Sequence, residues 1–197
     1  MTDVTIEGYT LGTSTVPRSP ITLNELAKLK ECVLFTEEDA RWLRQSGEIL
    51  RDYVEEILDV WYGFIASKPY LLEAFCDPAT GKPDEAYLAA VRKRFGRWIL
   101  DTASANYDQA WLDYQYEIGR RHYRVAKNRT DGAQAADVVP MRYMLALLYP
   151  VTATLEPFLA RRGHAAAEVQ KMREAWTKSV LLQLILWCEP YVDLEDF

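Results

Sequence analysis

The sequence predicts an all-α fold, and two observations support this. Apolar side chains recur at helical spacing, as in the stripe formed by Val54, Leu58, Trp61 and Ile65. No segment bounded by hairpin turns alternates strictly between apolar and polar residues, as a half-buried strand would. With 197 residues the chain is long enough for one domain with its own hydrophobic core.

Capping and breaking residues divide the chain into elements. Two capping boxes, Thr22 with Glu25 and Thr36 with Asp39, indicate helix starts. Proline breaks a helix in its interior, so we expect Pro150 to kink the helix that contains it. The expected helices cover residues 22–32, 36–67, 70–75, 84–102, 107–127, 140–163 and 165–187, with an irregular segment over 1–20 and a loop over 77–83.

Composition excludes several classes of function. The net charge of -6 argues against a nucleic-acid or membrane-surface binder, since either partner favours a cationic protein face. The cysteines Cys32, Cys76 and Cys188 share no metal-ligand spacing, so we expect free thiols. The N-terminus does not resemble a secretory signal, and no apolar run approaches the ~20 residues of a membrane span. We therefore expect a cytoplasmic protein.

His122, one of only two histidines, lies inside an aromatic-rich predicted helix. It shares a helix face with Tyr114 and Ile118, at spacings of eight and four residues. One neutral imidazole from one helix is what haem iron needs on its proximal side. Because no other ligand type lies three or four residues away, a zinc or di-iron site is disfavoured. The alternative, that His122 is simply a core residue, stays open at this point.

Several segments of the chain resemble protoglobins, single-domain haem proteins related to the haem domains of globin-coupled sensors. The similarity extends from Gly8 to the C-terminus. It is carried by residues 54–64 with the Trp61-Tyr62 pair, by 88–102, by 107–122, by 149–161 and by 187–197. The resemblance implies a globin fold, a three-over-three helical sandwich, with an extra helix before the first globin helix. It divides the chain into an N-terminal extension, residues 1–20, that helps bury the haem, and one globin domain, 21–197.

The resemblance also assigns roles to individual residues. His122 corresponds to the proximal iron ligand, and Ile118, one turn earlier, to a residue on the proximal haem face. Arg94 corresponds to a partner of a haem propionate. The remaining residues expected to contact haem are the distal pair Trp61 and Tyr62, the distal Phe95, the wedging ring Phe75, and Val91, Met144, Leu147 and Val151.

The chain departs from the family pattern at Leu147 and at Tyr123. Leu147 stands where a large distal aromatic residue is expected, which should enlarge the pocket. Val91 falls one turn before Phe95, where myoglobin-like globins carry a distal histidine, so Tyr62 is the obvious polar group for a bound ligand. Tyr123, rather than a second histidine, follows His122.

We therefore expect a haem b protein that binds O2, CO and NO reversibly, as a carrier or sensor. The resemblance also implies a homodimer formed through the last two long helices. Two alternatives remain: a haem enzyme acting on NO, nitrite or peroxide, and a haem-free helical interaction module. No distal acid–base pair is evident in the sequence, which disfavours peroxidase chemistry.

Overall fold

A computed structural model describes residues 5–195 and 197. The α-helices are α1 (Leu23–Cys32), α2 (Glu37–Leu50), α3 (Val54–Ala66), α4 (Pro69–Leu72), α5 (Glu85–Ser104), α6 (Gln109–His122), α7 (Met141–Ala146), α8 (Leu148–Ala153), α9 (Glu156–Leu159) and α10 (Ala166–Cys188). Three 3₁₀ turns, η1 (Glu73–Phe75), η2 (Ala160–Arg162) and η3 (Glu189–Tyr191), follow α4, α9 and α10. Within this part of the chain the only β pairing is one isolated bridge between Cys76 and Pro83.

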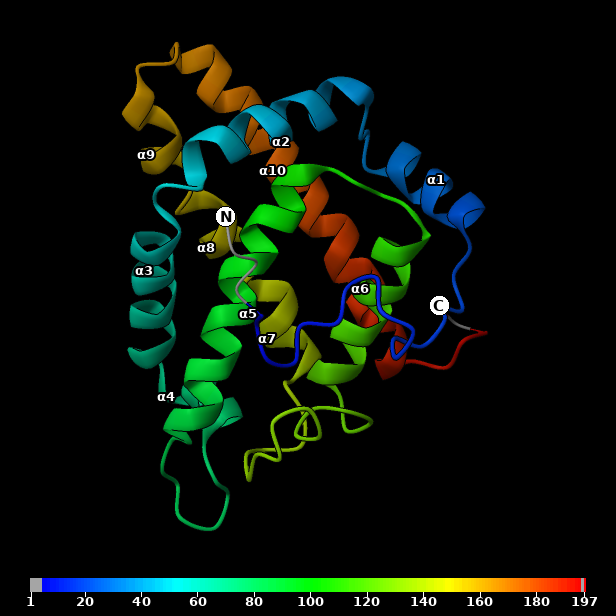
Figure 1. Cartoon of the computed structure of the whole chain (residues 1–197), viewed down its shortest axis with the longest axis vertical. Helices are drawn as coiled ribbons and strands as arrows, with labels where there is room; N and C mark the ends of the chain where they lie inside the picture. Colours follow the sequence, from blue (N-terminus) through cyan, green and yellow to red (C-terminus); the bar gives the residue numbers. More distant parts are fainter. Residues whose placement is uncertain (1–4, 196) are drawn as a thin grey trace.

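The longest helix, α10, organises the packing. It lies against α2, α6 and α8, while α2 also crosses α5, and α3 packs beside α5 (Figure 1). Large buried side chains fill the core between these helices. Trp176 on α10 is fully buried and donates from its indole Nε1 to Ser46 Oγ at 2.7 Å, which ties α10 to α2. The core is therefore built from helix faces, as the sequence predicts.

Both predicted capping boxes are present. Thr22 and Thr36 accept from the backbone N–H groups of Glu25 and Asp39, and each acidic side chain accepts from the backbone N–H of its threonine. The prediction of one continuous helix over residues 36–67 is wrong, because the chain bends between α2, which ends at Leu50, and α3, which begins at Val54. At the bend Asp52 pairs with Arg162, and Tyr53 packs on Phe158 with ring centroids 6.1 Å apart. These are tertiary contacts that helical periodicity does not reveal.

The helix expected over 107–127 ends earlier, at His122. Tyr123 is extended, with φ -114° and ψ 163°. The carbonyl oxygen of His122 accepts from the backbone N–H of Val139 and from the hydroxyl of Tyr191, each at 2.8 Å. These donors hold the helix end, and residues 123–140 continue as turns and bends before α7.

The helix expected over 140–163 is broken into α7, α8, α9 and η2, with Pro150 and Pro157 inside the run. Residues 141–162 together are long and apolar enough to cross a membrane by length and composition alone. The segment nevertheless carries Leu155 and Leu159, both fully buried in the protein core. About 28% of the most apolar stretch of this segment is buried inside the protein.

The N-terminal segment, residues 5–20, has no helix and runs across α5 and α6 (Figure 1). The hydroxyl of Tyr9 donates to Asp101 Oδ2 on α5 at 2.8 Å. Gly8 has φ +71°, and a Cβ there would lie 2.6 Å from Thr130 and 2.7 Å from Arg94. The close approach of this segment to α5 and to the 123–140 loop therefore depends on glycine at position 8.

Candidate functional site

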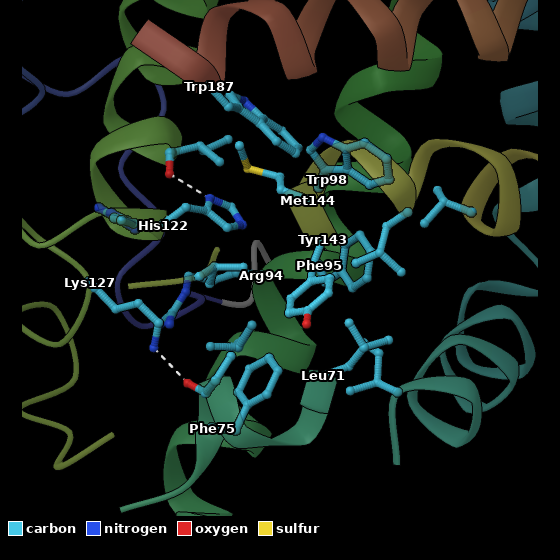
Figure 2. A pocket seen from close by; sticks show the side chains of 18 of the residues that line it. Leu71, Phe75, Arg94, Phe95, Trp98, His122, Lys127, Tyr143, Met144 and Trp187 are labelled. Carbon is cyan, nitrogen blue, oxygen red and sulfur yellow. Dashed lines mark hydrogen bonds between the residues drawn. The ribbon is translucent and has the colours of Figure 1, made fainter. Parts of the chain in front are cut away.

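A largely apolar cavity of about 250 Å³ opens between α3, α5, α6 and the α7–α8 segment. Its walls include Tyr62 from α3, Phe95 from α5, His122 from α6 and Leu147 from the α7–α8 junction. Apolar cavities with a few converging polar groups are typical of small-molecule and cofactor sites. Figure 2 shows His122 pointing into this cavity, with Arg94 and Lys127 on one side of its ring and Trp187 and Met144 on the other.

His122 is oriented by two contacts. Its Nδ1 lies 2.8 Å from the carbonyl oxygen of Ile118, one turn earlier in α6 (Figure 2). A carbonyl only accepts, so Nδ1 carries the proton and Nε2 keeps a free lone pair. The imidazole also stacks on Trp187, with centroids 5.3 Å apart and planes 16° apart. Burial lowers the pKa of His122, so the ring is neutral at pH 7 and suited to bind a metal.

The opposite part of the cavity is lined by aromatic rings from α3 and α5. Trp61 stacks on Phe95 with ring centroids 4.7 Å apart. Tyr62 and Phe95 pack edge to face with ring centroids 6.4 Å apart. The Tyr62 hydroxyl is buried, and no described residue offers it a hydrogen-bond partner. Burial raises its pKa, so the hydroxyl stays protonated. A buried tyrosine hydroxyl normally has a partner, so this one is available to a ligand in the cavity.

One side of the cavity carries basic side chains. Arg94 forms two hydrogen bonds with Asp131, at 2.9 and 2.6 Å, and a third with the carbonyl of Glu7 at 3.1 Å. Arg121 pairs with Glu117 and donates to the carbonyl of Gly8 at 2.6 Å. These arginines therefore hold the N-terminal segment against the cavity.

The structure brings the expected site residues together. Tyr62, Phe75, Val91, Arg94, Phe95, Ile118, His122, Met144, Leu147 and Val151 all line the cavity. Trp61 lies behind Phe95 instead and reaches the cavity only through that ring. The guanidinium of Arg94, expected to meet a propionate, is engaged by Asp131.

Sequence reasoning missed other wall residues. Trp187 and Tyr9 belong to distant parts of the chain, and no local pattern connects them with His122. The predicted helix over residues 107–127 includes Lys127, but α6 ends at His122, so helical periodicity does not predict the inward position of this lysine.

A protein-family model described as Protoglobin matches residues 22–196 of this chain. The chain belongs to the protoglobin family. As a protoglobin it is a haem globin, and family membership supports a small gas as its ligand. The globin domain of the Geobacter sulfurreducens globin-coupled sensor has a similar fold, with a TM-score of 0.65 and 18% identity. The match covers 85% of this protoglobin and 97% of that domain. No curated protein sequence matches this chain.

These findings confirm the expected globin fold, with α1 as the additional N-terminal helix. The cavity residues of this protoglobin also fit a haem. The free lone pair of His122 Nε2, the unpartnered hydroxyl of Tyr62 and the apolar aromatic walls are complementary to an iron porphyrin carrying a gas.

Proposed function

We propose that this protein binds haem b through His122 and reversibly binds O2, CO or NO on the side of the cavity lined by Tyr62 and Phe95. The observation that carries this proposal is the bond from His122 Nδ1 to the Ile118 carbonyl, because it fixes the tautomer that leaves Nε2 free. Bound haem would supply the iron that coordinates the gas. The protein supplies the imidazole, the dry aromatic walls and one hydroxyl donor.

The acidic residues of the cavity do not support redox enzyme chemistry. Asp101 accepts hydrogen bonds from Tyr9 and Arg97, and Asp131 from Arg94. Neither carboxylate is free to act as a general acid or base. Gas binding therefore accounts for the described wall residues better than turnover of NO, nitrite or peroxide.

An absorption spectrum of the reduced protein, before and after addition of CO, tests the proposal. We expect a Soret band that shifts and sharpens with CO, because haem held by one imidazole of the protein would be able to bind CO at its iron. Full-length protein expressed with ample haem but lacking a Soret band would refute haem binding. A Soret band that does not respond to CO would refute gas binding alone.

The Tyr62→Phe substitution tests the role assigned to the unpartnered hydroxyl. A hydrogen bond to a group that gains negative charge contributes about 1.5–3 kcal/mol. Bound haem would place more negative charge on O2 than on CO, so the Tyr62 hydroxyl would donate a stronger hydrogen bond to O2. We therefore expect the O2 dissociation rate to rise about tenfold or more, with little change for CO, measured by stopped-flow exchange. Tyr70→Phe, at a half-exposed tyrosine on the cavity rim, is the control and should leave both rates unchanged. Equal rates in Tyr62→Phe and the native protein would exclude the donor role.

We also propose that the protein forms a homodimer through the α7–α9 segment and α10. Support comes from apolar side chains that this segment leaves in solvent, with Leu145 41% and Tyr149 77% exposed. Exposed apolar side chains that cluster on one face mark contact surfaces. Sedimentation velocity of the purified protein gives the mass that tests this proposal, and a monomer at all concentrations would reject it.

A further inference from the structure

Lys127 is a buried lysine in the wall of the cavity, only 3% exposed. Its Nζ donates to the carbonyl oxygen of Ala74 at 2.7 Å and to the hydroxyl of Tyr87 at 3.3 Å (Figure 2). An ammonium group has three donors, so these neutral partners leave one N–H for a group in the cavity. No carboxylate among the described residues lies within ion-pair distance of Lys127.

The other charges nearby are already compensated. Arg94 is paired with Asp131, Arg121 with Glu117, and Asp137, which raises the pKa of Lys127, is itself bound by Arg124 at 2.7 Å. Burying an uncompensated ammonium is costly, and desolvation lowers the pKa of Lys127 to about 8. The Tyr87 ring, whose centroid lies 4.9 Å from Nζ, offsets part of this cost by a cation–π contact. No described carboxylate pairs with the ammonium, so the cavity wall carries one positive charge without an anionic partner.

The hydroxyl of Tyr87 adds a second donor beside the ammonium of Lys127. Tyr87 lines the cavity, and burial raises its pKa to about 12, so its hydroxyl stays protonated. That oxygen accepts from Lys127 and keeps its own O–H for another acceptor. An ammonium and a hydroxyl side by side form a donor pair that suits a carboxylate.

We propose that Lys127, assisted by the Tyr87 hydroxyl, binds a propionate carboxylate of the haem. This inference rests on the proposed function, because it needs haem in the cavity. It transfers to Lys127 the role expected of Arg94, whose guanidinium is occupied by Asp131 and the N-terminal segment. Lys127 is then a cofactor-binding residue and the source of the charge that holds the carboxylate.

A purely structural role for Lys127 makes a different prediction. If its ammonium only holds the Ala74 carbonyl at the 3₁₀ turn η1, its loss should weaken the binding of any porphyrin equally. If it binds a carboxylate, its loss should matter only for porphyrins whose carboxylates are free. Haem and its dimethyl ester, in which both carboxylates are esterified, therefore separate the two roles.

The experiment compares the native protein with Lys127→Met, each loaded with haem or with haem dimethyl ester. The rate of porphyrin loss is followed by transfer to excess apomyoglobin. We expect Lys127→Met to lose haem about 10- to 100-fold faster than the native protein, the range of a charge-assisted hydrogen bond. The two proteins should lose the ester at similar rates. Equal acceleration for both porphyrins would overturn the proposal.

Lys30→Met is the matched control. The Nζ of Lys30 lies over the rings of Phe35 and Tyr107, 5.3 and 5.1 Å from their centroids, and Lys30 is not in the cavity wall. This variant should lose both porphyrins at the native rate. A native protein that takes up neither porphyrin would refute the proposed function itself, a result distinct from equal acceleration.

The proposal assumes that the Lys127 ammonium has no carboxylate partner within the protein. The pH dependence of the unfolding free energy of the apoprotein tests this assumption without haem. The groups facing Lys127 are Tyr87, Asp137, the Arg94–Asp131 pair and His122. With its pKa lowered to about 8, Lys127 binds fewer protons folded than unfolded between pH 8 and its ordinary range near 10.5. The unfolding free energy of the apoprotein should therefore rise with pH across this window, relative to Lys127→Met. A constant difference between the two would show an ammonium compensated within the protein and would overturn the proposal.

Discussion

The His122→Ala variant is expected to bind haem at least about 100-fold more weakly than the native protein and to lose the native CO response. Loss of even a supporting contact to a metal ligand costs about 10- to 100-fold in metal affinity, and this change removes the proposed ligand itself. Titration of the apoprotein with haem measures the affinity. Added imidazole should restore much of the spectrum, because it can occupy the space left beside Trp187.

His164→Ala is the control for this experiment. His164 is the other histidine, lies 3.5 Å from Glu168 at the start of α10, and is absent from the described cavity wall. Its removal should leave haem affinity and the CO response unchanged. If instead His122→Ala retained native affinity, haem would be held without this imidazole and the assigned proximal ligand would be wrong.

Gly119→Ala is expected to destabilise the protein and to alter the reduced haem spectrum. A Cβ at position 119 would lie 2.9 Å from the Cα and 3.0 Å from the carbonyl oxygen of Trp187. Those are backbone atoms, so α6 and α10 must separate. Overpacking of this kind costs about 1–3 kcal/mol, even though alanine favours helices. The shift also moves His122, three residues further along α6. Urea unfolding measures the first effect and absorption the second.

Gly63→Ala on α3 is the matched control, because a Cβ there has nothing within 4 Å. Only the helix propensity of alanine changes, so we expect a gain in unfolding free energy of up to about 1 kcal/mol and an unaltered haem spectrum. Native stability in Gly119→Ala would mean that the contact between α6 and α10 is loose and does not position His122.

The sequence predicted the helices whose ends carry local signals. The starts of α1 and α2 followed from capping boxes at Thr22 and Thr36. The end of α6 could not be predicted in this way. It is fixed by hydrogen bonds from Val139 and Tyr191 to the His122 carbonyl, and both donors are distant in the chain. The bend between α2 and α3 could not be predicted either, because it also depends on a contact with a distant part of the chain. Apolar residues keep the same helical phase on both sides of it, and Tyr53 is held there by Phe158.

In the candidate site, too, residues on helices could be predicted from the sequence, whereas residues positioned by loops could not. His122, Tyr62 and Phe95 could be named in advance because family resemblance identifies positions on helices, and these line one cavity. Lys127 could not be named, since its inward position depends on the course of the 123–140 loop. The occupation of Arg94 by Asp131 and Glu7 likewise depends on where two non-helical segments meet.

The carbonyl partner of His122 has a consequence for electron donation. A carboxylate at Nδ1 would draw the proton toward itself and give the ring imidazolate character, which strengthens its donation to iron. The Ile118 carbonyl cannot take up that proton, so the ring stays a neutral, weaker donor. A weaker donor stabilises ferric iron less and leaves the ferrous form easier to maintain. If His122 binds haem iron as proposed, the Ile118 carbonyl would therefore favour the ferrous iron that binds gases over the ferric form.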